Sequence, residues 1–423
     1  EVMEPVVIVS ACRTPIGRYG GALKNIPVGE LGAVALNGAV ERAGIDPASV
    51  HEVAAGQAYS NGECANAARF SLLAAGWPEH VPGITLDRRC CSGLDAILYG
   101  AMKIQTGNAE IVVAGGLDSM SQAELYLPGD IKWGLGGRVD PKWGFMPGGH
   151  GAMGMWGIPF YDRIQRGRPM SQPISRYGEL NSMMTWAENA AKAEGITRQA
   201  ADEWSVRSHA RAVAAWQAGI FTPEVVPVPL PAGKKGQPAS LDRDETPRAE
   251  TTLEKLAALK PVYKDGVCTA GNSSSENDGA SFLVLMSASQ AQALGKPPLA
   301  RFVSAGHAAC DPTLTYPAVP ASVNQALGRA GLTIDDIDLF EIQEAFAVQM
   351  LADAKLMGIA REDYDRKINV NGSGISLGHP IGATGAMRLT TLLNQMQRQQ
   401  ARYGLITICG GGGQGIAAVF ERV

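Results

Sequence analysis

A stretch with two adjacent cysteines contains residue types that can support nucleophilic chemistry. Cys90 and Cys91 are followed by Ser92-Gly93 and then by alanine, leucine, isoleucine and methionine at helical spacing. This pattern predicts a tight turn that delivers one of the two thiols to the N-terminus of a buried helix. The unpaired N–H groups and partial positive charge there favour a thiolate, the nucleophilic form of cysteine. The alternative is that both cysteines are small buried apolar residues, a common role for free cysteine.

Two glycine-rich stretches further along the sequence hold other reactive side chains. His379 lies in the loop from Asn371 to Gly385, and Cys409 follows an apolar strand and precedes a run of glycines. Glycines let the backbone approach a ligand closely. Taken alone, a glycine-rich loop with one histidine is more often a structural turn. Neither stretch matches a phosphate-binding loop pattern.

The composition is that of a globular protein with a large core. The chain has 423 residues, of which 45% are hydrophobic and 18% charged, and its net charge is −4. A mildly acidic balance argues against non-specific nucleic-acid binding, and no apolar run is long enough for a membrane helix. The first residues lack the pattern of a secretory signal, and the seven scattered cysteines suit a reducing compartment. We therefore expect a cytoplasmic protein that binds neither nucleic acid nor a membrane.

Short apolar strands alternate with helices of small residues in the first part of the chain. Strands are expected at Val6–Ser10, Val50–Ala58 and Ile111–Ala114, and a helix at Val28–Ala43, closed by Gly44. This alternation is typical of an α/β fold with parallel strands. The expected frame for the reactive residues is therefore an α/β domain.

The second part of the chain repeats the plan of the first. Three pairs of segments match in the same order, which indicates a duplicated α/β unit with a pseudo-twofold axis. They are Ala43-Gly-Ile-Asp-Pro with Ala330-Gly-Leu-Thr-Ile, Gly100-Ala-Met-Lys with Gly385-Ala-Met-Arg, and Ile111-Val-Val-Ala with Leu405-Ile-Thr-Ile.

The segment between the two halves breaks the repeat. Helices are expected within it at Thr185–Ala193 and Arg198–Ala218, and Gly129–Gly157 is rich in glycine, methionine and tryptophan. Long irregular stretches in compact proteins are usually functional or disordered, so we expect a lid or substrate domain. The apolar stretch could form the wall of an acyl pocket, a subunit interface or an ordinary lid core. A basic run could be a solvated surface or could meet phosphates or a substrate carboxylate; it comprises Arg163, Arg166, Arg168 and Arg176.

Taken together, the motifs resemble those of the thiolase family, in order and along nearly the whole chain. They are Arg13-Thr-Pro-Ile-Gly, Cys90-x-Ser-Gly-Leu, Gly115-Gly-x-x-Ser-Met-Ser, Thr269-Ala-Gly-Asn, Glu344-Ala-Phe-Ala, Gly378-His-Pro-Ile-Gly-Ala-Thr-Gly and Cys409-x-Gly-Gly-Gly-x-Gly. The resemblance implies an α/β fold of two similar halves with mixed five-stranded sheets, in a layered α-β-α-β-α core with an inserted loop domain. The implied boundaries are 1–121 for the N-terminal half, completed by about 271–295, then 122–270 for the insert with the coenzyme A contacts, and 296–423 for the C-terminal half.

The resemblance also implies roles for the reactive residues. Cys90 matches the nucleophile, whereas Cys91 falls where the family usually has glycine. His379 matches the residue that takes the proton from the nucleophile and donates into a first oxyanion hole. Cys409 matches the acid/base acting at the α-carbon of acetyl-CoA. The backbone N–H groups of Cys90 and Gly411 match a second oxyanion hole.

Coenzyme A contacts and departures from the family pattern follow from the same comparison of motifs. Arg248 matches a contact to the adenosine end of coenzyme A, and Ala270 and Ser274 match pantetheine contacts. Gln343 replaces the usual asparagine that orients a water in the first oxyanion hole. Bulky side chains replace small residues near the acyl pocket at two positions, Met184 and Trp186. No metal or redox cofactor is implied, because coenzyme A is a substrate.

The implied activity is that of a 3-ketoacyl-CoA thiolase, which releases acetyl-CoA and a shortened acyl-CoA in fatty acid β-oxidation. A biosynthetic acetoacetyl-CoA thiolase uses the same residues for a Claisen condensation and is the alternative. A ketoacyl synthase fits less well, because that relative typically lacks the second cysteine. A catalytically weak acyl-CoA or lipid-binding relative is a third option, against which the intact cysteines and histidine argue. The implied partners are acyl-CoA, coenzyme A and further copies of the chain, as a homodimer or a dimer of dimers.

Overall fold

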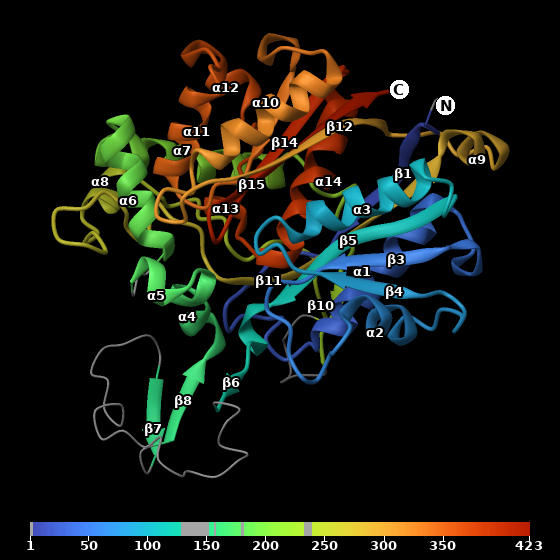
Figure 1. The fold of residues 1–423 in the computed structure, drawn as a ribbon, viewed down its shortest axis with the longest axis horizontal. Helices are drawn as coiled ribbons and strands as arrows, with labels where there is room; N and C mark the ends of the chain where they lie inside the picture. Colours follow the sequence, from blue (N-terminus) through green and yellow to red (C-terminus); the bar gives the residue numbers. More distant parts are fainter. Residues whose placement is uncertain (1–2, 128–151, 156–157, 179–181, 232–238) are drawn as a thin grey trace.

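The fold is described by a computed structural model (Figure 1). It describes residues 3–127, 152–155, 158–178, 182–231 and 239–423. The predicted apolar stretch Gly129–Gly157 therefore lies mostly outside the described residues.

The first half of the chain forms a mixed five-stranded sheet. Its order is β4 (Gly83–Leu86), β3 (Glu52–Gly56), β5 (Ile111–Ser119), β11 (Asn277–Ser287) and β1 (Val6–Arg13). The first three strands run parallel, and β11 is antiparallel to both β5 and β1. The short β2 (Gly17–Arg18) also pairs with β11. Of these three parallel strands, β3 and β5 lie at predicted strands, whereas no strand was predicted from the sequence at β4.

The second half repeats this sheet with one difference. Its order is β13 (Leu339–Ile342), β14 (Tyr403–Gly410), β15 (Gln414–Arg422) and β12 (Ala300–Ala309). The place of a fifth strand beside β13 is taken by a single bridge between Phe340 and Ile368. The two sheets join edge to edge, because β1 and β12 pair at Val7–Arg301 and Ile8–Ala300.

Helices cover both outer faces of the sheets and fill the space between them (Figure 1). The first outer layer holds α1 (Val28–Ala43) and α2 (Ala67–Ala74), and the second holds α10 (Ala318–Ala330) and α11 (Ala347–Leu356). The central layer holds α3 (Ser92–Gln105) and α14 (Ile381–Gln399), which pack on each other. One apolar cluster joins this pair to the inner sheet faces, and two others lie under the outer helices. The predicted α/β fold with layered halves is thereby confirmed.

The duplication extends to the way equivalent helices end. Helix α1 stops at Gly44 with φ +62°, and α10 stops at Gly331 with φ +67°. Each glycine takes the left-handed conformation that closes a helix. A short 3₁₀ helix and then a parallel strand follow in both halves, at Pro47–Ser49 and Ile334–Asp336. The matched sequence segments therefore fold alike.

An insert separates β5 from β11 in the first half, whereas a short glycine turn joins β14 to β15 in the second. Its two long helices, α6 (Ser182–Glu194) and α7 (Arg198–Gln217), agree with the predicted ranges to within a few residues. Its shorter elements are β6 (Leu125–Tyr126), β7 (Ala152–Met155), β8 (Ile158–Asp162), α4 (Arg163–Gly167), α5 (Ile174–Tyr177), β9 (Val228–Pro229), β10 (Ser240–Leu241) and α8 (Leu253–Ala257). Three short helices elsewhere are α9 (Ala288–Ala293), α12 (Tyr364–Lys367) and α13 (Gly374–Leu377).

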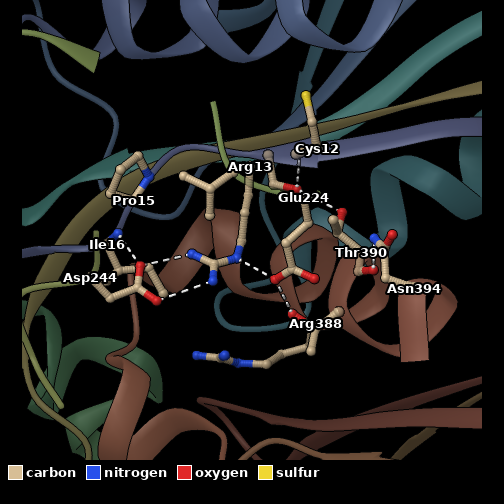
Figure 2. Close-up of polar contacts among 12 residues, drawn as sticks. Cys12, Arg13, Pro15, Ile16, Glu224, Asp244, Arg388, Thr390 and Asn394 are labelled. Atoms are coloured by element: carbon tan, nitrogen blue, oxygen red, sulfur yellow. Dashed lines mark hydrogen bonds and ion pairs between the residues drawn. The ribbon is translucent and has the colours of Figure 1, made fainter. Parts of the chain in front are cut away.

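Buried ion pairs fasten the insert to the first sheet (Figure 2). Arg13, at the end of β1, places its Nε 2.7 Å from Glu224 Oε1 and its Nη1 2.8 Å from Asp244 Oδ1. All three side chains are almost fully buried. Removing one partner of such a group would leave an uncompensated buried charge, so the three residues fix how the insert sits on the core.

Candidate active site

The two adjacent cysteines lie immediately before the central helix α3, as their spacing predicted. Cys91 is the residue that caps the helix, and Cys90 precedes it. Cys90 is 5% exposed and lines a pocket, whereas Cys91 is fully buried and lies outside the pocket wall. The Cys91 sulfur instead approaches the Ile408 carbonyl oxygen at 3.6 Å. Of the two thiols, only Cys90 can meet a substrate in this pocket.

His379 reaches the same pocket from the loop that precedes the other central helix, α14. Its backbone N–H donates to Asn277 Oδ1 at 2.8 Å, and its Nδ1 lies 2.6 Å from Thr384 Oγ1. The Thr384 hydroxyl donates its proton to the Pro380 carbonyl at 3.0 Å. Its oxygen must therefore accept a hydrogen bond from the Nδ1–H group, which leaves Nε2 as the unprotonated nitrogen. The imidazole is thus oriented to accept a proton through Nε2.

Cys409 enters the pocket from the end of β14. The chain then reverses into β15 through Gly412 and Gly413, whose φ angles are +84° and +79°. A side chain on Gly413 would also collide with the Cys310 carbonyl oxygen, so glycine is required there. This tight turn places Cys409 and Gly411 beside the loop of Cys90.

The three reactive groups rest in their neutral forms. Burial raises the pKa of Cys90 to about 11, opposed first by the Arg89 guanidinium and then by the N–H groups of Gly411 and of Cys90 itself. Burial, followed by the proximity of Cys90, holds the pKa of Cys409 well above its ordinary value. Burial, followed by Arg388, lowers the pKa of His379 to about 3. A thiol beside an unprotonated imidazole can lose its proton as a bond to sulfur forms.

The pocket wall is largely apolar, with a few charged groups. Its lining combines the reactive residues with aromatic and methionine side chains, and the Trp186 and Phe346 rings meet edge to face at 5.1 Å between centroids. Trp186 and Met184, the two bulky replacements, both belong to this wall. The remaining lining includes Tyr59, Met120, Ile164, Met183, Ile381, Arg89, Arg168 and Glu276.

The other predicted site residues are divided between the pocket and its surroundings. Ser274 lines the pocket, whereas Ala270 and Arg248 are exposed outside its wall. Gln343 is fully buried behind the wall, where its Oε1 accepts from Arg388 Nε at 3.2 Å. Arg388 also donates to the carbonyl of Gly378, next to His379, at 2.6 Å. Within the described residues, the Gln343 amide nitrogen has no hydrogen-bond partner.

Of the four arginines in the predicted basic run, one lines the pocket, and the other three contact residues outside its lining. Arg163 pairs with Glu124 at 3.3 Å. The guanidinium carbons of Arg166 and Arg176 lie 4.9 and 5.1 Å from the ring centroids of Tyr161 and Tyr177, respectively. Arg168 lines the pocket, where it forms an ion pair with Glu276.

Sequence reasoning missed a buried carboxylate that joins the loop after β3 to the first turn of α14. Asp118, at the end of β5, accepts backbone N–H bonds from Ala58 and Tyr59 at 3.1 Å and from Gly382 at 2.6 Å. The first two belong to the loop after β3, and Gly382 lies in the first turn of α14, which follows His379. Burial raises the pKa of Asp118 to about 6. The only sequence signal was its place within Gly115-Gly-x-x-Ser-Met-Ser.

Two protein-family models match nearly the whole chain. The family model for the thiolase N-terminal domain matches residues 6–289, and that for the C-terminal domain matches residues 296–422. The chain belongs to the thiolase family. The predicted resemblance is therefore confirmed, and with it an acyltransferase that uses coenzyme A thioesters.

Two curated thiolase relatives and one solved thiolase structure cover the chain almost completely. The acetyl-CoA acetyltransferase of Cupriavidus necator is 43% identical over 99% of this chain and 100% of its own. That of Escherichia coli is 43% identical over 100% of both chains. The crystal structure of the Bacillus anthracis acetyl-CoA acetyltransferase is 39% identical, with a TM-score of 0.89 over 100% of this chain and 99% of that one.

The described part of this thiolase contains neither a metal-binding cluster nor a membrane-spanning helix. No group of three or more histidine, cysteine, aspartate or glutamate side chains in that part of the chain could hold a metal ion. Nor does any helix there have the length and apolar character needed to cross a bilayer.

Proposed function

We propose that this thiolase is an acetyl-CoA acetyltransferase, which joins two acetyl-CoA molecules into acetoacetyl-CoA and free coenzyme A and also catalyses the reverse reaction. The supporting observation is one pocket that brings together Cys90, His379 and Cys409 and has the bulky side chains of Met184 and Trp186 in its wall. Bulky side chains take up space that small residues would leave to the acyl chain, which suits a small acyl group. The names of the relatives point the same way.

In the thiolysis direction, the first half-reaction transfers an acetyl group to the enzyme. The Cys90 sulfur attacks the keto carbon of acetoacetyl-CoA, and His379 Nε2 accepts the thiol proton. The carbon–carbon bond then breaks, and the acetyl-CoA enolate takes a proton from the Cys409 thiol. Because Cys409 is held protonated in the resting site, it is ready to act as this acid.

The second half-reaction returns the enzyme to its starting state. The sulfur of coenzyme A attacks the acetyl group on Cys90, and its proton passes to the Cys409 thiolate. Cys90 leaves as a thiolate and recovers its proton from His379. Condensation is the same sequence in reverse, and in both directions the N–H groups of Cys90 and Gly411 are suited to hold an oxygen that gains negative charge.

The degradative thiolase predicted first from the sequence is the second candidate. Met183 and Met184 line the pocket, and unbranched methionine side chains can move to admit a longer acyl chain. The relatives' names nevertheless favour the smaller substrate, which was the alternative weighed beside it.

Thiolysis of acetoacetyl-CoA and of 3-ketodecanoyl-CoA, followed by loss of enolate absorbance, separates the two. We expect at least a tenfold preference in kcat/KM for acetoacetyl-CoA, since burial of misfitting methylenes costs about 1–3 kcal/mol. Met184→Ala should shift the preference toward the longer substrate, whereas the control Met102→Ala, at an exposed position of α3, should not. A preference for the longer substrate would support the degradative enzyme. Activity on neither would support an acyl-CoA-binding relative.

A further inference from the structure

Arg89 stands directly before Cys90, in an unusual backbone conformation. Its φ is +51°, in the left-handed region that glycine adopts more readily than arginine. The side chain is nevertheless well placed: it lines the same pocket as Cys90 and is only 24% exposed. Backbone strain of this kind persists only where the surroundings hold the residue firmly.

Several contacts fix the guanidinium of Arg89 in the pocket wall. Its Nη1 donates to the Ala58 carbonyl at 2.9 Å, and its Cζ lies 5.0 Å from the centroid of the Tyr59 ring. Asp118 accepts the N–H groups of the same two residues and so holds that loop in place. The Asp87 carboxylate is 3.6 Å from Nη1 and half exposed. The positive charge is thus held by a carbonyl, a ring face and one solvated acid.

Arg89 lines the same pocket as Cys90 and is the positive side chain with the largest effect on its ionisation. Arg89 is the largest factor favouring the thiolate, and Asp87 opposes it. His379 is neutral, with its pKa lowered to about 3, and Cys91 and Cys409 are buried thiols. Arg168, which also lines the pocket, forms an ion pair with Glu276. The remaining groups near this pair of residues are Tyr59 and Asp118.

We propose that Arg89 is a positioning residue that holds a fixed positive charge beside Cys90 and thereby favours its thiolate as the nucleophile. This rests on the proposed function, in which Cys90 accepts the acyl group. Burial of Cys90 makes its thiolate unfavourable. The Arg89 guanidinium therefore adds to the partial positive charge of the helix N-terminus in stabilising that thiolate. Arg88, one residue earlier, forms an ion pair with Asp95 and does not line the pocket, so it provides a matched control.

The test measures alkylation of Cys90 by iodoacetamide as a function of pH, with the modified residue located by tandem mass spectrometry of the peptide. Arg89→Met should slow alkylation about tenfold at each pH from about 7 to 9, because loss of the charge displaces the profile by about one unit toward higher pH. Arg89→Lys should keep most of the effect, because it keeps the charge. Arg88→Met should alkylate like the parent.

Each outcome supports or overturns the proposal. A folded Arg89→Met protein, with the parent's thermal midpoint and an unshifted profile, overturns it. Should the methionine variant not fold, Arg89→Gln and Arg89→Lys provide the comparison, and identical profiles for these two overturn it. Alkylation needs no acyl-CoA, so a shifted profile in a chain without acetyl transfer would defeat only the proposed function. Normal acetyl transfer with an unshifted profile would defeat only the role of Arg89.

Discussion

The orientation of His379 depends on one hydroxyl group. Thr384 lies five residues further on, in the first turn of α14, and is fully buried. Because its own proton is directed to the Pro380 carbonyl, its oxygen accepts from His379 Nδ1. A histidine that must take a proton through Nε2 needs its other nitrogen protonated and held. Thr384 therefore selects the tautomer that the proposed reaction requires.

Thr384→Val should keep the side-chain shape and lose this selection. We expect acetoacetyl-CoA thiolysis to fall about 100-fold in kcat with little change in KM, because proton transfer and not binding is affected. Thr384→Ser, which keeps the hydroxyl group, should recover most of the activity. Steady-state kinetics on the three proteins check this. Equal kcat values for the valine and serine variants would contradict the assignment.

The functional residues could be predicted from the sequence where they belong to a motif. They could not be predicted where only their contacts in the folded chain identify them. The motifs indicated Cys90, His379, Cys409 and Gly411, and the structure brings all four to one pocket. Asp118 joins separate segments through backbone N–H groups, and Thr384 meets the His379 ring through its own side chain. Neither contact leaves much trace in a single sequence. The predicted roles of the site residues, including the coenzyme A contacts, stay predictions.

At the scale of elements, glycines bring the two catalytic helices together. A side chain on Gly93 of α3 would lie 2.7 Å from the Gly382 carbonyl oxygen, and one on Gly385 of α14 would collide with the backbone of Leu94. Cys90 precedes one helix and His379 precedes the other. The close packing of these helices therefore sets how far apart the two residues lie.

Gly385→Ala should separate α3 from α14 and damage both stability and activity. We expect a loss of about 2 kcal/mol of stability from overpacking. We also expect a fall of about 100-fold in kcat/KM from misplaced reactive groups. Gly328→Ala is the control, because this glycine lies within α10 with open space around it. It should gain about 0.5–1 kcal/mol and keep its activity. Thermal unfolding and thiolysis assays check both, and an active Gly385→Ala protein would argue against this spacing role.

The bounds of elements with strong hydrophobic periodicity were predicted closely. The bounds of elements that depend on pairing with distant strands or charged residues were not. Helix Val28–Ala43 has the predicted bounds, since small apolar residues at helical spacing end in a glycine. Strand Val6–Arg13 continues three residues beyond the prediction, because polar Arg13 is buried by ion pairs that sequence does not show. The pairing of β1 with β12, which joins the sheets, involves two residues on each strand and leaves no pattern.

At the scale of the whole molecule, a cluster of buried charges connects the three parts of the chain. Arg13 comes from the first half, Glu224 and Asp244 from the insert, and Arg388 and Glu341 from the second half. These groups influence one another's ionisation. Buried charges seldom add stability in proportion to their number, and their best-attested use is to fix one arrangement. In this protein they lie where the first half, the insert and the second half of the chain meet, and we infer that they hold these three parts in one arrangement.

Glu341 should make the stability of the molecule fall as pH rises. It is 4% exposed and accepts a bond from Ser373 Oγ at 2.9 Å. Burial, opposed first by Arg388, raises its pKa to about 8. Below the pKa of an ordinary glutamate, about 4.3, both folded and unfolded chains hold the proton and the effect is absent. Between there and about pH 8 only the folded chain holds it, so folding binds a proton. Each pH unit in that window then costs about 1.4 kcal/mol.

Glu341→Gln imitates the protonated side chain and should remove this pH dependence. We expect the thermal midpoint of the variant, measured by calorimetry, to rise steadily relative to that of the parent from pH 5 to pH 8. Glu421→Gln is the control: hydrogen bonding, first to Arg301, lowers the pKa of this partly buried carboxyl, so it stays ionised throughout that range. Its difference from the parent should not change with pH. A flat difference for Glu341→Gln would mean that this carboxyl is ionised in the folded protein, with Arg388 compensating its charge.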